Sequence, residues 1–160
     1  MIIQNGISAA DTESAFMDAG LADYLYDGDP TGGWPTLGEL VDRGQRLVVI
    51  AERDGPPPAW YHDGRTLLTD TSFAVDSEAD FTCDRRRGDP TAPLFLLNHW
   101  IARQVPDRAD AAIVNQRGYI VQRARACEAV TGRLPTFIAV DFYSLGDVVG
   151  AVETLNGVRT

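Results

Sequence analysis

Polar side chains that could do chemistry follow the short apolar stretches of this 160-residue sequence. They are Gln4-Asn5, Tyr26-Asp27, Glu52-Arg53-Asp54, Asn98-His99 and Asp141-Phe142-Tyr143. Carboxylates and imidazoles at such places can transfer protons or orient a catalytic group. Because the carboxyl ends of parallel strands meet at one edge of an α/β fold, these polar ends together predict a shared site.

Each candidate also has a simpler structural interpretation. Asp141 shares a strand face with Phe137 and Ala139, where a carboxylate either orients a catalytic group or closes the strand with a hydrogen bond. Glu52 could be a solvated strand end, and His99 could be a satisfied core histidine. Asn115, placed before a helical pattern, is most simply an N-cap.

Other motifs that would define a chemistry are missing from the sequence. It has no Gly-rich phosphate loop, no G-x-S-x-G elbow and no zinc-ligand spacing. The run Asp84-Arg85-Arg86-Arg87 is typical of a solvated charged segment, although three arginines could meet a phosphate. No cofactor or metal site is predicted: acidic side chains at the strand ends could hold calcium, but carboxylates this scattered do not make a ligand set.

Alternating strand and helix patterns must position these residues. Strands are predicted near 2–4, 23–26, 47–52, 94–98 and 137–141, and helices over 8–20, 36–44, 115–130 and 145–157. Ser8 and the pair Thr36 and Glu39 indicate helix starts, and Gly132 indicates a helix end. This order predicts parallel strands, either in an open doubly wound sheet or in part of a (β/α)8 barrel. Residues 53–93 are an irregular connection, and so long a connection is usually functional.

Composition limits the class of protein. With 160 residues, 44% of them hydrophobic, the chain can form a single domain with one core. A net charge of -9 disfavours nucleic acid and anionic lipid surfaces as partners. No apolar run is long enough to cross a membrane, and the N-terminus lacks a signal-peptide pattern. From their number alone, Cys83 and Cys127 could equally be two buried thiols.

An ordered set of segments resembles a known family. The segments are "WPTLGELVDRGQRLVVIAE", "WYH", "FTC" followed by "RG", "LFLLNHW", Asn115, Cys127 and "GRLPTFIAVDFY". They resemble the X-domain-like phosphodiesterases of the phosphatidylinositol-specific phospholipase C type, in order and over nearly the whole chain. The resemblance implies a distorted TIM-type barrel that cleaves phosphodiesters. Two histidines would act as general base and acid there, with an arginine opposite the developing charge and carboxylates that orient the histidines.

The resemblance also implies roles for particular residues. Family members carry the histidines and the arginine on their first strands, and this chain begins after them. We therefore expect residues 1–160 to be a single domain, the C-terminal part of a TIM-type barrel with about five parallel strands. Asp141 is the expected catalytic carboxylate, and Glu52, Asn98, His99 and Tyr143 are expected to line the substrate pocket. Exported family members suggest a Cys83–Cys127 disulfide and an oxidising, extracellular compartment.

Three hypotheses about function remain. The first is a phosphoric diester hydrolase acting on a phosphodiester or phospholipid headgroup, inactive as this chain alone and able to self-associate through open barrel edges. The alternative is a non-catalytic part-barrel that binds a phosphorylated ligand or a partner chain. The third is an unrelated open α/β domain.

Overall fold

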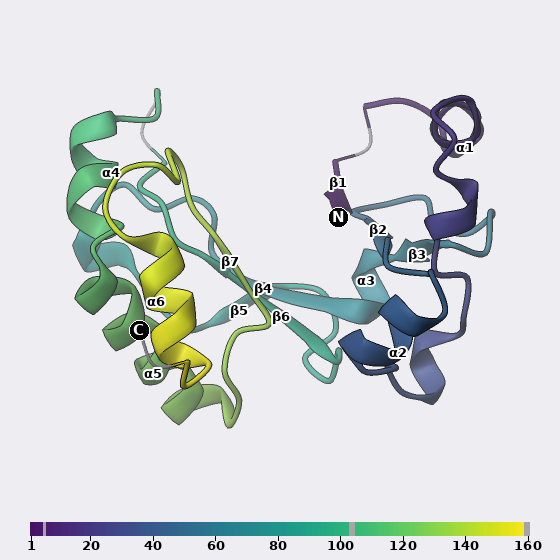
Figure 1. Cartoon of the computed structure of the whole chain (residues 1–160). Coiled ribbons are helices and arrows are strands. Elements are labelled where there is room, and N and C mark those ends of the chain that lie inside the picture. The colour runs from purple at the N-terminus through teal and green to yellow at the C-terminus, as the bar shows by residue number, and fades with distance from the viewer. Residues whose placement is uncertain (5, 103–104, 159–160) are drawn as a thin grey trace. The chain divides into compact units, whose positions relative to one another are not determined.

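The computed structural model describes residues 1–4, 6–102 and 105–158. The chain divides into two compact units, Met1–Leu67 and Leu68–Thr160 (Figure 1). Each unit combines helices with a sheet whose strands are all or mostly parallel, so the predicted α/β class is confirmed. Among the described residues neither sheet closes into a barrel.

The first unit contains a parallel sheet in the order β1-β2-β3. Its elements are β1 (Ile2–Ile3), α1 (Ala9–Asp18), α2 (Leu37–Asp42), β2 (Val49–Ala51), β3 (Tyr61–Asp63) and α3 (Gly64–Leu67), with short 3-10 helices at Ala22–Tyr24 and Pro30–Gly32. Val49 and Tyr61 belong to the core cluster against which Phe16 of α1 packs. Because side chains alternate along a strand, Ile50 and His62, which are opposite each other in the register, occupy the other face.

The predicted helix starts in this unit are confirmed. Ser8 is the N-cap of α1, and its hydroxyl accepts a hydrogen bond from the backbone N–H of Asp11 at 3.1 Å. Thr36 and Glu39 form the predicted capping box of α2, with Glu39 N donating to Thr36 Oγ1 at 3.2 Å and Thr36 N donating to Glu39 Oε2 at 2.8 Å. Each such cap typically contributes about 1 kcal/mol, and it is encoded by residues only three positions apart.

The strand predicted near 23–26 is wrong. Tyr24 N and Leu25 N donate to carbonyls three residues earlier, which makes a 3-10 turn instead of a ladder. Only Leu25 forms an isolated parallel bridge, to Leu47. β1 therefore pairs directly with β2, with Ile2 opposite Ile50.

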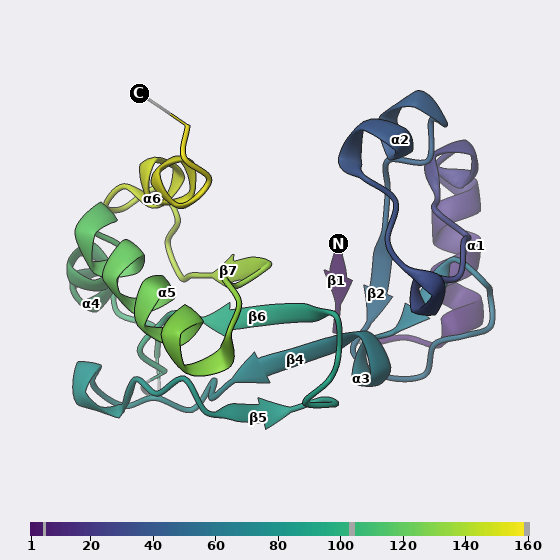
Figure 2. The same ribbon diagram turned by 90° about the horizontal axis from the view of Figure 1, so that it is seen from below.

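The second unit contains a sheet in the order β5-β4-β6-β7. Its elements are β4 (Leu68–Thr71), a 3-10 turn (Glu78–Asp80), β5 (Arg85–Arg87), β6 (Leu94–Asn98), α4 (Arg108–Val114), α5 (Arg117–Thr131), β7 (Phe137–Ala139) and α6 (Val148–Leu155). β4, β6 and β7 are parallel, and β5 runs antiparallel at the edge. The helices α4, α5 and α6 lie on one side of this sheet (Figure 2). Phe95 and Leu97 pack against Ala124 of α5, so Leu96 and Asn98 belong to the opposite face.

The irregular connection predicted over residues 53–93 is wrong, because it contains β3, α3, β4 and β5. These strands have only three or four residues and mix polar with apolar side chains, so no apolar run marks them. The strand near 94–98 consequently pairs with β4 and not with β2. On its other side this strand, β6, pairs in parallel with β7, with Leu97 opposite Ile138.

The helix predicted over 115–130 forms as two helices, α4 and α5. Asn115 is the C-cap of α4, which corrects its interpretation as an N-cap. Ile113 of α4 is 53% exposed, whereas Ile120, Ala124 and Cys127 of α5 are fully buried. Gly132 ends α5 in the left-handed conformation (φ 79°), as predicted.

The Cys83–Cys127 disulfide expected from the family resemblance is present, with the two Cα atoms 5.0 Å apart. Cys127 lies on α5, and Cys83 lies in the segment between β4 and β5. The bond therefore attaches this segment to the helix layer of the second unit.

Candidate functional site

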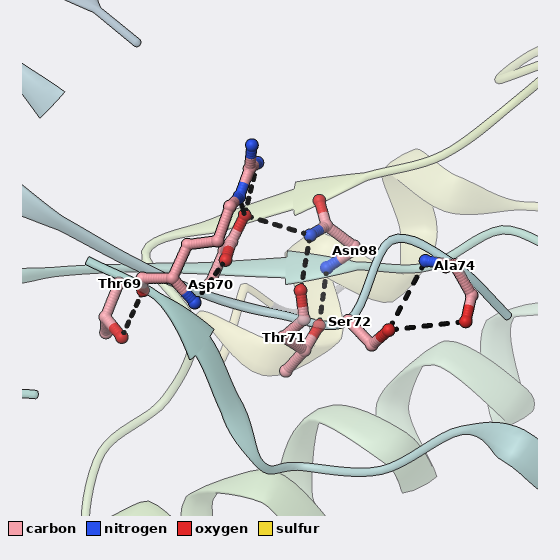
Figure 3. Close-up of polar contacts among 7 residues, drawn as sticks. Thr69, Asp70, Thr71, Ser72, Ala74 and Asn98 are labelled. Atoms are coloured by element: carbon pink, nitrogen blue, oxygen red, sulfur yellow. Dashed lines mark hydrogen bonds and ion pairs between the residues drawn. The ribbon is translucent and has the colours of Figure 1, made fainter. Parts of the chain in front are cut away.

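A buried polar network lies on the face of the second sheet opposite to α5. Asp70 of β4 and Asn98 of β6 are each 2% exposed, and their side chains point toward each other in Figure 3. Asp70 Oδ2 accepts hydrogen bonds from Asn98 Nδ2 at 3.3 Å and from Arg87 Nε and Nη2 at 2.9 and 2.6 Å. Because charge-assisted bonds are short and strong, Asp70 holds the guanidinium of Arg87 in one orientation.

Backbone groups complete this network. Asn98 Nδ2 donates to the carbonyl of Thr71 at 2.7 Å, and Asn98 N donates to Thr71 Oγ1 at 3.0 Å (Figure 3). On the neighbouring strand, Arg87 N donates to Asp70 Oδ1 at 3.1 Å. The carboxyl ends of β4 and β6 are therefore joined by side chains as well as by the ladder, which makes this edge of the sheet rigid.

Asp141 lies two residues after β7, in a turn that Asn115 holds. Asn115 is fully buried, and its Nδ2 donates to the carbonyls of Asp141 at 2.8 Å and Phe142 at 3.4 Å. Phe142 has a positive φ of 49°, and Gly146 has a φ of 75°. A Cβ at Gly146 would lie 2.3 Å from the carbonyl oxygen of Asn115, so only glycine fits there. Asn115 thus determines the position of the backbone that carries Asp141.

A narrow crevice adjoins Asp141 at the ends of β6 and β7. It is lined by His99, Trp100, Ile101, Asp107, Asp110, Ala111, Val114, Asn115 and Asp141. The crevice is too narrow to admit a water molecule. Asn115 Oδ1 is buried and has no hydrogen-bond partner among the described residues. Asp141 and His99, both predicted site residues, therefore come together in this crevice.

His99 is fully buried, and both of its ring nitrogens are engaged. Its Nε2 lies 2.8 Å from the carbonyl oxygen of Val114, and its Nδ1 lies 2.9 Å from Arg123 Nη1. The ring stacks on Phe81 with centroids 5.2 Å apart. Burial, aided by the positive charge of Arg123, lowers the pKa of His99 to about 4. His99 is consequently neutral at physiological pH and has the geometry of a core histidine.

His62, in the first unit, is also buried. Its Nε2 lies 3.0 Å from the carbonyl oxygen of Tyr26, and its ring packs against those of Tyr26 and Trp34. Burial lowers the pKa of His62, and the bond to Tyr26 partly opposes this change. An imidazole that is buried and neutral is a poor general acid at physiological pH.

The remaining predicted residues differ in their surroundings. Glu52 directly follows β2 in the first unit, and its backbone N–H donates to the carbonyl of Ile3 at 2.9 Å. Tyr143 is 77% exposed in the second unit. Asn98 takes part in the network around Asp70. The substrate-binding roles of Glu52, Asn98, His99 and Tyr143, and the catalytic role of Asp141, stay predictions.

Sequence reasoning missed Asp70 and Arg87. In the sequence, Arg87 belongs to a run that is typical of a solvated charged segment, and Asp70 lies inside the predicted irregular connection. The alternation of Leu68 and Asp70 with Thr69 and Thr71 is the period-two signal that could have indicated a strand with one carboxylate on a defined face.

Two negative findings concern metals and membranes. Within residues 1–4, 6–102 and 105–158, no three His, Cys, Asp or Glu side chains are grouped in a way that could hold a metal ion. In the same described part of the chain, every helix is too short or too polar to cross a bilayer.

Comparison with known proteins identifies the family. The PI-PLC X 1 family model matches residues 1–156. "PI-PLC X domain-containing protein 1" of Arthroderma benhamiae is 28% identical over 96% of this chain and 56% of its own length. An "Uncharacterized secreted protein" of the same fungus is 24% identical over 95% of this chain and 40% of its own length. This chain thus spans about half the length of these relatives, and no solved structure matches it significantly. The chain belongs to the PI-PLC X domain family.

Proposed function

We propose that this chain contributes part of the site of a phospholipase-C-like phosphoric diester hydrolase, whose substrate is a phosphodiester or phospholipid headgroup. The observation that carries the proposal is the family match, which runs from residue 1 to residue 156 and includes the whole Asp70 network. Membership in this family argues against the hypothesis of an unrelated open α/β domain.

The proposed architecture is a set of consecutive staves of a TIM-type barrel. In such barrels, side chains that face the interior alternate with side chains that face the helices. Each sheet here has one face against helices, and the other face carries His62 in the first unit and Asp70 and Asn98 in the second. A barrel whose interior holds an active site requires polar residues on the sheet face away from the helices.

Within the proposed site, Asp141 orients a catalytic group. The turn that carries it is fixed by Asn115, so its carboxylate is attached to a rigid support. Arg87, aligned by the buried carboxylate of Asp70, supplies a positive charge whose side chain is 44% exposed. A cation held in place where negative charge develops is the kind of stabilisation that phosphodiester cleavage needs.

The 160 residues by themselves are proposed to be inactive. They contain only two histidines, His62 and His99, and each is buried with a ring nitrogen against a backbone carbonyl. A general base and a general acid must each reach a reacting oxygen within about 3 Å. Neither histidine can do so without leaving its hydrogen bonds.

The proposal can be tested with purified protein and two chains. The 160-residue chain is assayed against phosphatidylinositol and a generic phosphodiester, beside a version extended by the in-frame coding sequence upstream of Met1. Activity in the extended version alone, lost on Asp141→Asn, is the expected result. Turnover by the 160-residue chain that disappears on His62→Ala or His99→Ala would overturn it, because those histidines would then be the catalysts.

We further propose that the protein works in an oxidising compartment outside the cell. The Cys83–Cys127 disulfide supports this, since such bonds persist mainly in exported proteins. The relative that is named a secreted protein points in the same direction.

A further inference from the structure

Two arginines of the second unit, Arg85 and Arg133, come together at one end of the sheet. Arg85 Nη1 donates to the carbonyl of Pro90, and its Nη2 lies 3.4 Å from the carbonyl of Thr131. Arg133 Nη1 donates to the carbonyl of Pro93 at 3.0 Å. These carbonyls belong to segments that precede β6 and β7, so the guanidinium groups lie at the opposite end of these strands from Asn98 and Asp141.

Arg133 presents a pair of donors that its surroundings leave unused. Its Nε and Nη2 atoms are both buried, and neither has a hydrogen-bond partner in the described part of the chain. Nε–H and one Nη2–H point the same way from the planar guanidinium, along the edge that binds two oxygens of a carboxylate or phosphate. A buried donor without an acceptor typically costs about 1–3 kcal/mol, so such a fork is unusual unless it serves a ligand.

The charge around this fork also favours an anion. Neither Arg85 nor Arg133 forms an ion pair with a carboxylate in the described residues. Desolvation, and then the positive charge of Arg85, lower the pKa of Arg133. The guanidinium of Arg133 also lies over the ring of Phe95, 6.0 Å from its centroid, which gives one of its faces an apolar support.

The simplest structural interpretation is that these arginines satisfy carbonyls near the C-terminus of α5, where positive charge is favourable. This interpretation accounts for Arg85, whose Nη2 faces the carbonyl of Thr131, the last residue of that helix. It does not account for the buried fork of Arg133, which is directed at no carbonyl. A ligand with two or more oxygens would satisfy this fork and reduce the repulsion between the two cations.

We propose that Arg133 and Arg85 form a binding site for a small oxyanion of the phosphate class, separate from the proposed catalytic face. Arg133 would hold two oxygens through Nε and Nη2, and Arg85 would supply the second positive charge. The proposal does not depend on the phosphodiesterase assignment, because it uses residues at the other end of the strands. Such a site recognises the phosphate group itself, whether the group belongs to inorganic phosphate or to a phosphate monoester on a lipid headgroup.

The test is calorimetric titration and thermal unfolding of the whole chain with inorganic phosphate, against chloride at equal ionic strength. We expect phosphate to bind and to raise the melting temperature. Arg133→Gln should weaken binding about tenfold or more, since a bidentate charged contact is lost. Arg133→Lys keeps the charge but loses the fork, so it should weaken binding about fivefold or more. Arg85→Gln should weaken it by an intermediate factor.

Arg125→Gln is the matched control, because Arg125 lies on α5, the helix that ends before Arg133, and forms an exposed pair with Glu128. It should leave phosphate affinity within about twofold of the wild type. Equal affinity in the wild type, Arg133→Lys and Arg85→Gln, or no binding by the wild type, would overturn the proposal. If Arg133→Gln fails to fold by circular dichroism, the other two variants still decide the outcome.

A second arm identifies the source of the phosphate group. Flotation with phosphatidylcholine vesicles, with and without phosphatidic acid, is compared between the wild type and Arg133→Lys. Binding to phosphatidic acid that the variant loses assigns the site to a lipid headgroup, whereas phosphate binding without vesicle binding assigns it to a free anion. Vesicle binding that is equal in both proteins counts against the site.

Discussion

Replacing His99 by Gln is expected to remove a large part of the acid sensitivity of this protein. Nδ1 of His99 faces Arg123 Nη1 at 2.9 Å, and because a guanidinium can only donate, Nδ1 must be the acceptor. Nε2 therefore carries the hydrogen and donates to the carbonyl of Val114. Protonation of Nδ1 would direct a second N–H at the guanidinium and place two cations in contact inside the core. The folded protein consequently holds the ring neutral.

The size of the expected loss in unfolding free energy follows from the pKa of His99. Burial is the main cause that lowers the pKa of His99 from 6.5 to about 4. Between these two values the unfolded chain binds a proton that the folded chain does not, so the free energy of unfolding decreases as the pH falls. The contribution of the neutral ring is complete above about pH 6.5, and about 3 kcal/mol of it is lost by pH 4.

Several other charged or titratable groups surround the ring. Tyr119 and Arg123 face it from α5, Glu78 is hydrogen-bonded to Tyr119, and Asp107, Asp110 and Asp141 line the same crevice. All of them are unchanged in His99→Gln. The difference in unfolding free energy between wild type and variant at each pH therefore isolates His99.

Urea unfolding followed by circular dichroism, at several pH values from neutral to about 4, measures this difference. Gln can accept from Arg123 and donate to Val114, so the variant should fold, with a loss of about 1 kcal/mol at neutral pH from the missing stack on Phe81. The wild type should then lose about 3 kcal/mol more than the variant on acidification. Adding His62→Gln separates the contribution of the other histidine. Parallel pH curves for wild type and His99→Gln would refute the reasoning that the buried ring is held neutral.

Three further predictions concern stability. Asp70→Asn should destabilise the chain by about 1–3 kcal/mol in urea unfolding, because a buried charge pair loses one partner. Glu128→Gln is its control: Glu128 belongs to an exposed pair, so the change should cost less than about 1 kcal/mol. Replacing Cys83 and Cys127 by Ser should cost about 4 kcal/mol by loop closure over 44 residues, and an unchanged melting temperature under reducing conditions would contradict this. Gly146→Ala should lower the melting temperature measurably, since its Cβ would overlap a backbone carbonyl at a positive φ; equal melting temperatures would disprove the close approach.

Helix ends and the longest apolar strand were predictable because their signals are local. Ser8, the capping box at Thr36 and Gly132 each act on backbone groups a few residues away, and all three are confirmed. Leu94–Asn98 is five buried residues in a row, which is the pattern of a strand covered on both faces.

The middle of the chain was not predictable in the same way. β3, β4 and β5 are short, and their identity as strands depends on pairing with segments distant in the sequence, such as Leu68 with Leu94. The same is true of the candidate site. Asp70 and Arg87 are 17 residues apart, and only the antiparallel pairing of β4 with β5 brings their side chains together. No local pattern contains that information.

Stability alone does not explain why the charged side chain of Asp70 is buried. Asp70 is almost completely buried and receives donors from Arg87 and Asn98, so the folded state tolerates its charge. Taking such a group out of water costs several kcal/mol, and apolar residues of similar volume are often as stable or more stable at buried ion pairs. Leu94 and Leu96 on the same face of β6 show that apolar side chains fit this surface. A carboxylate, an amide and an arginine that are fixed together at the carboxyl ends of two parallel strands therefore fit the substrate site proposed for this face.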